Sequence, residues 1–277
     1  MKNKVDLFRI LILFASVCVS SLRTAPAESA PKFAGTPVAL GGITTVHVPL
    51  SVQEQGYAGE GANDAPPYAL ASLAVPRNFD PKKPWPILIV LSTSDFKIQD
   101  RYDLARIYSP TALAQGWIAI AGDGPNLPRH DTAGWRLSMT LAALDALYKS
   151  FPGSVHWPVA CAGYSGGAKR TGQLAPLFSL AGCRVIGIFL TGINVDTVSE
   201  GYREYHPGRA FLHTPIFISS GEDDKVATLQ EQWGVKNSIE RTGFDRVRLE
   251  RFPQGHVVKR AHLRDALNWF RQLDRTR

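Results

Sequence analysis

Apolar and polar residues alternate between two kinds of segment along the chain, and this pattern predicts its secondary structure. Continuous runs of β-branched and other large apolar residues are typical of strands that are buried on both faces. Such runs lie at 84–92, 116–124, 159–165, 184–192 and 214–221. Further strands are predicted at 36–50, 68–75 and 246–250.

Between these runs, apolar residues recur at spacings of three and four, which predicts amphipathic helices. The clearest is 132–151, with Leu137, Leu141, Leu144 and Tyr148 on one face. Other helices are predicted at 168–180, 225–241 and 262–273. Strands that alternate with helices favour right-handed crossovers, and so predict an α/β fold with a mostly parallel central sheet and helices on both faces.

In such sheets, ligands bind at the edge where the carboxyl ends of the strands meet the loops. A serine, an acid and a histidine fall in loops directly after predicted strands, namely Ser165, Asp224 and His256. We therefore expect them to meet at one edge of the sheet.

The motif Gly163-Tyr164-Ser165-Gly166-Gly167 fits the G-x-S-x-G pattern of a nucleophile elbow. Such an elbow holds its serine on a sharp strand-to-helix turn, and the small residues on either side let strand and helix approach closely. The backbone N–H of Gly166 is the predicted first donor of an oxyanion hole. A plain glycine turn after a strand is the alternative.

A nucleophilic serine needs a base, and the base needs an acid that orients it. The stretch FISSGEDDKVA (217–227) supplies Asp224, and FPQGHVV (252–258) supplies His256. The chain order Ser, acid, His is that of α/β hydrolases and differs from the orders of chymotrypsin and subtilisin. Asp196, after an earlier strand, is the alternative acid, and Asp223 is interpreted as a loop residue.

These motifs give the chain a resemblance to the α/β-hydrolase superfamily. The stretch LAVPRNFDPKKPWPILIVLS (73–92) resembles the entry to secreted esterases of the feruloyl esterase and polyhydroxybutyrate depolymerase kind, and to the catalytic domains of prolyl oligopeptidases. GEDDKVA is similar to the acid loop of the family, G-x-x-D-x-x-V, which selects Asp224 over Asp223. QGH resembles its histidine loop. The resemblance extends from about residue 66 to the C-terminus and implies an α/β-hydrolase fold.

The chain departs from this family at one loop. The family usually has His-Gly after its third strand, and the following residues supply the second oxyanion N–H. This chain has Leu91-Ser92-Thr93-Ser94-Asp95 there. A backbone N–H does not depend on the side chain, so Ser94 is predicted by position as the second donor, with Thr93 as the neighbouring candidate.

Two segments are predicted to shape the substrate site, 123–135 and 194–214. We expect both to lie over the carboxyl edge of the sheet, where specificity loops belong. The candidate substrate-binding residues are Tyr164, His130 and Tyr202. A solvent-exposed loop is the alternative explanation of their polar side chains. His262, on the last predicted helix, is expected to be exposed.

Residues 1–27 are predicted to be an export signal that is cleaved. Lys2, Lys4 and Arg9 precede an apolar run at 10–19, and an A-x-A cleavage site ends at Ala27. A membrane anchor is the alternative, but the run is shorter than the roughly 20 residues of a spanning helix. The mature chain, 28–277, is expected to be a single domain, periplasmic or extracellular, without stable membrane association.

The net charge and the cysteines indicate which partners and cofactors this chain is expected to lack. Residues 1–27 hold four Lys or Arg and one Asp, so the formal net charge falls from +7 to +4 on their removal. The remaining basic residues are scattered, and no nucleic-acid partner is predicted. Cys161 and Cys183, at opposite ends of neighbouring strands, are expected to be buried free thiols. No cofactor and no metal site are indicated.

Together these features predict a serine hydrolase that cleaves small-molecule carboxylic esters through Ser165, His256 and Asp224. A peptidase or acyltransferase with the same triad is one alternative. A hydrolase fold that binds ligands without catalysis is another, and the missing His-Gly is its support. The oligomeric state is not indicated.

Overall fold

The computed structural model describes residues 30–95 and 99–276. The predicted export signal, 1–27, lies outside these residues. Pro31–Arg277 form one compact unit. Within the described part of the chain, no helix combines the length and the apolar character needed to span a membrane.

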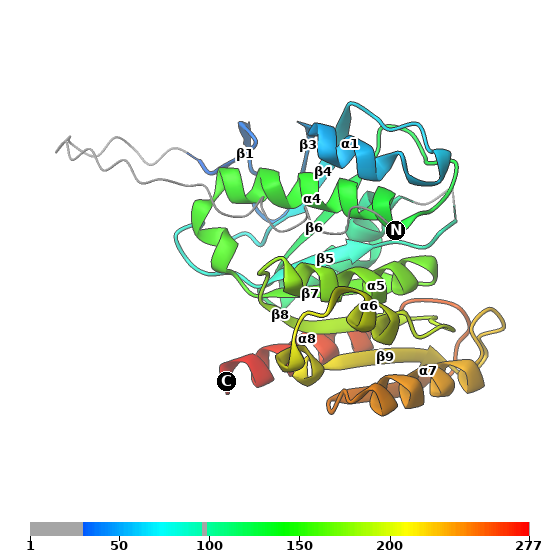
Figure 1. The fold of residues 1–277 in the computed structure, drawn as a ribbon. Coiled ribbons are helices and arrows are strands. Elements are labelled where there is room, and N and C mark those ends of the chain that lie inside the picture. The colour runs from blue at the N-terminus through cyan, green and yellow to red at the C-terminus, as the bar shows by residue number, and fades with distance from the viewer. Residues whose placement is uncertain (1–29, 96–98, 277) are drawn as a thin grey trace. The chain divides into compact units, whose positions relative to one another are not determined.

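An eight-stranded sheet forms the centre of this unit, with the spatial order β10-β9-β8-β7-β5-β6-β4-β3 (Figure 1). In chain order the strands are β3 (Ile43–Pro49), β4 (Tyr68–Ala74), β5 (Ile87–Leu91), β6 (Ile118–Asp123), β7 (Val159–Tyr164), β8 (Val185–Thr191), β9 (Ile216–Gly221) and β10 (Val247–Phe252). The strands from β5 to β10 pair in parallel, whereas β3 and β4 are antiparallel. The predicted mostly parallel sheet is therefore confirmed. A small hairpin, β1 (Lys32–Phe33) and β2 (Thr36–Pro37), precedes it.

The four predicted helices are present as α4 (Ala133–Ser150), α5 (Gly166–Leu180), α7 (Leu229–Thr242) and α8 (Arg260–Arg275). Helix α7 begins later than predicted, because Asp224 accepts hydrogen bonds from the backbone N–H groups of Val226 and Ala227 and so holds that segment in a loop. Short helices were not predicted, since they carry too few turns for a periodic pattern. They are α1 (Val52–Ala58), η2 (Glu60–Ala62), α2 (Asp100–Asp103), η3 (Leu104–Tyr108), α3 (Ser109–Ala114), η4 (Pro152–His156), α6 (Thr197–Tyr205) and η5 (Arg209–His213).

Strands β5 to β9 contribute alternate side chains to two hydrophobic cores, one on each face of the sheet. In β5, Ile87 and Ile89 pack towards α4, α5 and α7, while Leu88 and Val90 pack towards α3 and α8. Figure 1 shows α4 and α5 in front of the sheet and the red α8 behind it. Full burial of such a side chain contributes about 1.5–3 kcal/mol, so two-sided burial explains the continuous apolar runs.

Helix α8 approaches the sheet through a glycine. A Cβ placed on Gly187 of β8 would lie 2.2 Å from Cγ of Phe270 on α8, and Phe270 is fully buried. Any side chain at position 187 would therefore push α8 away from the sheet.

Two expectations about single residues need correction. Cys161 and Cys183 are free, but only Cys161 is fully buried, and the hydroxyl of Tyr148 lies 3.8 Å from Sγ of Cys183. His262 was predicted to be exposed, and this is wrong. Its side chain is 12% exposed, packs edge-on against the rings of Phe217 and Phe252, and places Nδ1 3.0 Å from Oγ of Ser219. Burial lowers the pKa of His262.

Candidate active site

Ser165 occupies a sharp turn between β7 and α5. Its φ of 55° and ψ of −121° lie in a region that residues with a side chain rarely adopt. The backbone N–H of Ser165 donates to the carbonyl oxygen of Thr191 at 2.9 Å, and this bond anchors the turn on β8. The chain therefore forms the strained strand-to-helix turn that the motif predicts.

Glycines make this turn possible. A Cβ on Gly163 would lie 2.3 Å from the carbonyl oxygen of Gly167, and one on Gly167 would lie 2.0 Å from the carbonyl oxygen of Ser92. Both contacts are with backbone atoms, which cannot move aside cheaply. The glycine at each end of the motif is thus required by the close packing of β7, β5 and α5.

The acid and the histidine come together at the same edge of the sheet. Oδ2 of Asp224 lies 2.7 Å from Nδ1 of His256. The other carboxylate oxygen of Asp224 accepts from the N–H groups of Val226 at 2.8 Å and Ala227 at 2.9 Å. Asp224 is 3% exposed, so a buried carboxylate in a fixed orientation faces the imidazole. A negative charge at this position favours the tautomer with the proton on Nδ1.

The ring of His256 contacts the residues that flank the Ser165 turn. A Cβ on Gly192, which follows the Thr191 that anchors Ser165, would lie 2.5 Å from Cε1 of His256. Tyr164, directly before Ser165, packs its ring 4.9 Å from the His256 ring and donates its hydroxyl to the His256 carbonyl oxygen at 2.6 Å. Nε2 of His256 is buried and has no hydrogen-bond partner among the described residues.

Ser94 lies against Gly166, the residue that follows Ser165. A Cβ on Gly166 would lie 1.6 Å from Oγ and 2.9 Å from the backbone nitrogen of Ser94. The loop after β5 therefore comes into direct contact with the first residue of α5. The structure thus brings together Ser165, Gly166, Ser94, Asp224 and His256.

The alternative acids do not contact His256. Asp223 is exposed. Asp196 is the N-cap of α6, where its side chain accepts from the N–H of Ser199 at 3.0 Å. Asp224 is accordingly the acidic residue that the structure pairs with the histidine.

The three candidate substrate-binding residues have different surroundings. Tyr164 supports the histidine as described above. The side chain of His130 is exposed, and its backbone exchanges two 2.9 Å hydrogen bonds with the side chain of Asn63. The ring of Tyr202 packs 6.4 Å from Phe211 and 5.7 Å from Phe244.

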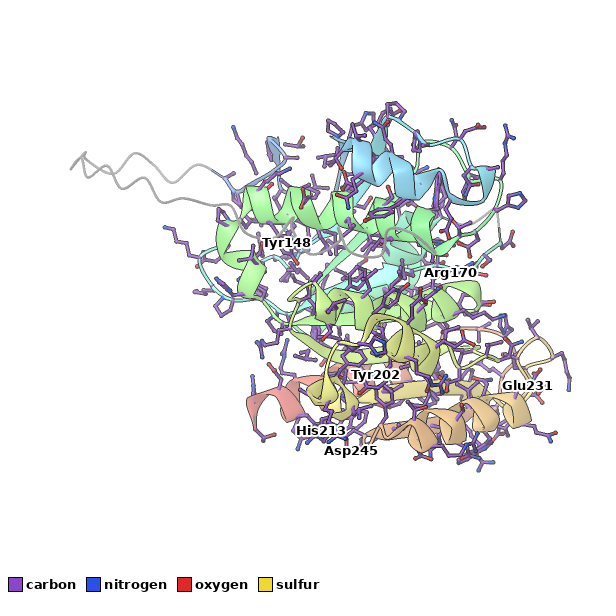
Figure 2. The ribbon with its side chains drawn as sticks, viewed as in Figure 1. Tyr148, Arg170, Tyr202, His213, Glu231 and Asp245 are labelled. Carbon is purple, nitrogen blue, oxygen red and sulfur yellow. The ribbon has the colours of Figure 1, made fainter. Side chains whose placement is uncertain are left out.

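Tyr202 lies away from the site. Phe244 and Asp245 lie shortly before β10, so they mark the amino end of the parallel strands, and Figure 2 shows Tyr202 near Asp245 and His213. Arg170 and Glu231, near the starts of α5 and α7, mark the opposite end (Figure 2). The expectation that 194–214 covers the carboxyl edge is therefore wrong for most of the segment, because it must return from the end of β8 to the start of β9.

Sequence reasoning missed a buried polar cluster beside the Ser94 loop. It consists of Asp100, Asp103, Asp123, Asp131 and Arg136. The side chain of Asp131 is 10% exposed, and the other four residues are buried. A signal existed, since Arg136 shares one stripe of α4 with Ala143 and Leu147, both buried. A charged residue on the buried stripe of a helix needs a partner inside the fold.

Burial and charge act differently on these carboxyl groups. Burial, reinforced by the charge of Asp100, raises the pKa of Asp123 to about 7. Burial also raises the pKa of Asp103. At Asp131 burial is outweighed by Arg136, by the Ser94 hydroxyl and by Arg170, and its pKa is lowered. Asp131 is therefore a carboxylate whose charged form is favoured by its surroundings.

A hollow opens beside this cluster. The segment 123–135 forms much of its wall, through Asn126, Leu127, Pro128 and Asp131, and Ser94 belongs to the same wall. This segment, unlike most of 194–214, adjoins the candidate oxyanion loop.

Comparison with known proteins defines the fold. No family model and no curated protein matches the sequence. Among solved structures, a ferulic acid esterase is similar with a TM-score of 0.60 and 14% identity, over 83% of this chain and 97% of the esterase. A bacterial heroin esterase is similar with a TM-score of 0.56 and 16% identity, over 86% of each chain.

A dipeptidyl aminopeptidase IV from Bacteroides ovatus, so named, is similar with a TM-score of 0.56 and 15% identity. The match covers 83% of this chain but only 35% of that longer protein. The chain thus has the α/β-hydrolase fold, and the resemblance seen in the sequence is confirmed at the level of fold.

Proposed function

We propose that this protein is a serine hydrolase that cleaves carboxylic esters through an acyl-enzyme intermediate. One observation carries the proposal: the buried, unpartnered Nε2 of His256 beside the strained Ser165 turn, on a ring whose Nδ1 is held by Asp224. A buried nitrogen without a partner costs free energy, and a base that awaits a proton explains it.

In the first step, Oγ of Ser165 attacks the ester carbonyl carbon while Nε2 of His256 takes the hydroxyl proton. The tetrahedral oxyanion collapses, the C–O bond to the alcohol breaks, and His256 returns the proton to the departing alkoxide. A water molecule then repeats the sequence on the acyl-enzyme and releases the carboxylic acid. Asp224 fixes the tautomer of His256 and stabilises its protonated form.

The oxyanion is held by two backbone N–H groups, from Gly166 and Ser94. Gly166 opens α5, so its N–H is free of any partner within that helix and lies at the positive end of the helix dipole. Ser94 lies against it from the other side. Each such donor contributes about 10²–10³ to kcat in serine hydrolases.

Ester substrates are favoured over peptides because the similar structures that the match covers along most of their length include esterases. The match covers 97% of the ferulic acid esterase and 86% of the heroin esterase. It covers only 35% of the aminopeptidase, so most of that protein lies outside the match. A peptidase or acyltransferase with the same residues remains the second candidate. We further propose that residues 1–27 direct export to the periplasm or the medium.

A fluorophosphonate probe tests this proposal on the protein that begins at Glu28. We expect an adduct on Ser165 by mass spectrometry, its loss in His256→Ala, and turnover of aryl esters at least tenfold faster than of dipeptide amides. An unlabelled, folded wild-type protein would instead support the binding-module alternative. Faster amide turnover would favour the peptidase.

A further inference from the structure

We propose that Asp131 and Arg136 are positioning residues that hold Ser94 as the second oxyanion donor, in place of the His-Gly that this loop lacks. The inference rests on the proposed function and names the groups on which its oxyanion hole depends. It concerns residues that the triad mechanism does not use.

Several polar groups of the Ser94 loop form hydrogen bonds with charged side chains. The hydroxyl of Ser94 donates to Oδ2 of Asp131 at 2.5 Å. The carbonyl oxygen of Thr93 accepts from Nη2 of Arg136 at 3.0 Å. Upstream, the N–H of Ser92 donates to Oδ1 of Asp100 at 2.6 Å. Hydrogen bonds to charged groups are stronger than those between neutral groups, so these contacts define the backbone of the loop.

Arg136 joins these anchors to one another. Its Nε donates to Oδ1 of Asp131 at 2.8 Å, and its Nη1 donates to Asp100. The Arg136 side chain is 10% exposed, as is that of Asp131. A planar guanidinium with fixed donors can hold two carboxylates and a carbonyl at set angles, which a lysine cannot. The loop is therefore tied to the N-terminal turn of α4.

Asp131 also links the loop to the nucleophile helix. Arg170 on α5 donates to the Asp131 carbonyl oxygen, and its Nε lies 3.7 Å from Oδ2 of Asp131. Asp131 thus connects the Ser94 loop to α5, the helix that begins directly after Ser165. A displacement of Asp131 would change the position of Ser94 relative to Gly166, where the two N–H groups must converge.

The test compares wild type with Ser94→Ala, Asp131→Asn and Arg136→Lys on an aryl ester. We expect kcat to fall between about 10- and 10³-fold with KM changed much less, because an oxyanion contact is made in the transition state. Affinity for an aryl trifluoromethyl ketone, which forms an oxyanion on Ser165, should fall in parallel. Asp131→Asn should also speed amide hydrogen exchange in the peptide that contains residues 92–95.

The matched control is an ion pair that shares the neighbourhood but has no link to Ser94. Arg129 contacts Asp64 at 2.8 Å, and their side chains are 65% and 83% exposed. Asp64→Asn, which removes this ion pair from outside the segment 123–135, should leave kcat, ketone affinity and exchange at 92–95 unchanged. The double variant Ser94→Ala/Asp131→Asn should lose no more activity than the worse single variant, because both substitutions act on the same contact between Ser94 and Asp131.

Wild-type kcat in both Ser94→Ala and Asp131→Asn, with Ser165 still labelled by a fluorophosphonate, would overturn this proposal alone. A wild-type protein without labelling or turnover would overturn the proposed function and this inference with it. If Arg136→Lys does not fold, Ser94→Ala decides the matter, because it removes one hydroxyl and leaves the buried charges paired.

Discussion

Tyr164 and His256 are joined by a 2.6 Å hydrogen bond from the tyrosine hydroxyl to the histidine carbonyl oxygen. The residue before Ser165 therefore fixes the backbone of His256, and the two rings pack 4.9 Å apart. Burial, together with the charges of Asp224 and Asp103, raises the pKa of Tyr164 to about 12, so the hydroxyl stays a donor throughout the neutral range.

Tyr164→Phe should lower kcat about 3- to 10-fold, since one neutral hydrogen bond contributes about 0.5–1.5 kcal/mol. The ring contact is retained, so the loss isolates the hydroxyl. Steady-state ester hydrolysis measures it, and Tyr202→Phe, in the distant aromatic cluster, should leave kcat unchanged. A larger effect of Tyr202→Phe would restore that residue as a substrate contact.

Asp224→Asn should lower kcat by as much as about 10⁴-fold, the loss known for the equivalent change in a serine protease. Asn keeps an oxygen for the N–H groups of Val226 and Ala227, which turns its amide towards Nδ1 of His256. The imidazole then carries its proton on Nε2 and cannot accept one from Ser165.

Asp223→Asn and Asp196→Asn are the controls for this change, since neither residue contacts the imidazole. Both variants should hydrolyse aryl esters within about twofold of wild type. A loss in Asp196→Asn comparable to that of Asp224→Asn would show that the acid was assigned to the wrong strand.

Ser165→Gly should raise the free energy of unfolding by about 1 kcal/mol, because glycine adopts the strained φ and ψ without a Cβ penalty. Its greater freedom in the unfolded chain offsets part of that gain. Ser165→Ala keeps the Cβ and should show no such gain, although both variants are inactive. Urea denaturation of the three proteins measures the difference, and equal stability of the two variants would argue against stored strain.

Asp123 should make stability depend on pH near neutrality. Its folded pKa is about 7, above its ordinary 3.8, so between these values the native state binds a proton that the unfolded chain has lost. The free energy of unfolding therefore falls as pH rises through this window, by up to about 1.4 kcal/mol per pH unit.

Urea denaturation at pH 5, 6.5 and 8 tests this with Asp123→Asn, which cannot titrate. The stability of wild type relative to the variant should decrease from pH 5 to pH 8. Asp64→Asn, an exposed acid, should track wild type at every pH. A constant difference between wild type and Asp123→Asn would contradict the raised pKa.

Much of the fold and of the site could be predicted because the signals are local. Runs such as 84–92 are apolar on both faces, and Ser165, Asp224 and His256 each follow a strand. In a parallel sheet those positions share one edge, so their meeting follows from topology without knowledge of any contact.

Other features depend on partners that are distant in sequence. Arg136 and Asp131 bind a loop about 40 residues upstream, and neither has a motif. The exposure of His262 depends on whether Phe217 and Phe252 cover it, which no helical pattern specifies. The return path of 194–214, by contrast, was implied by the parallel order of β8 and β9 and was overlooked.

The anchoring of the Ser94 loop also limits how this site can be exchanged with that of another protein of the same fold. Grafting the common His-Gly sequence onto positions 93 and 94 would remove the Ser94 hydroxyl, from which Asp131 accepts a hydrogen bond. The buried Asp131 carboxylate would then lack one of its hydrogen-bond donors. A working chimera would have to carry the residues at 131 and 136 along with the loop. Loop and cluster are therefore expected to be inherited as one unit, so that natural variation at position 94 accompanies variation at position 131.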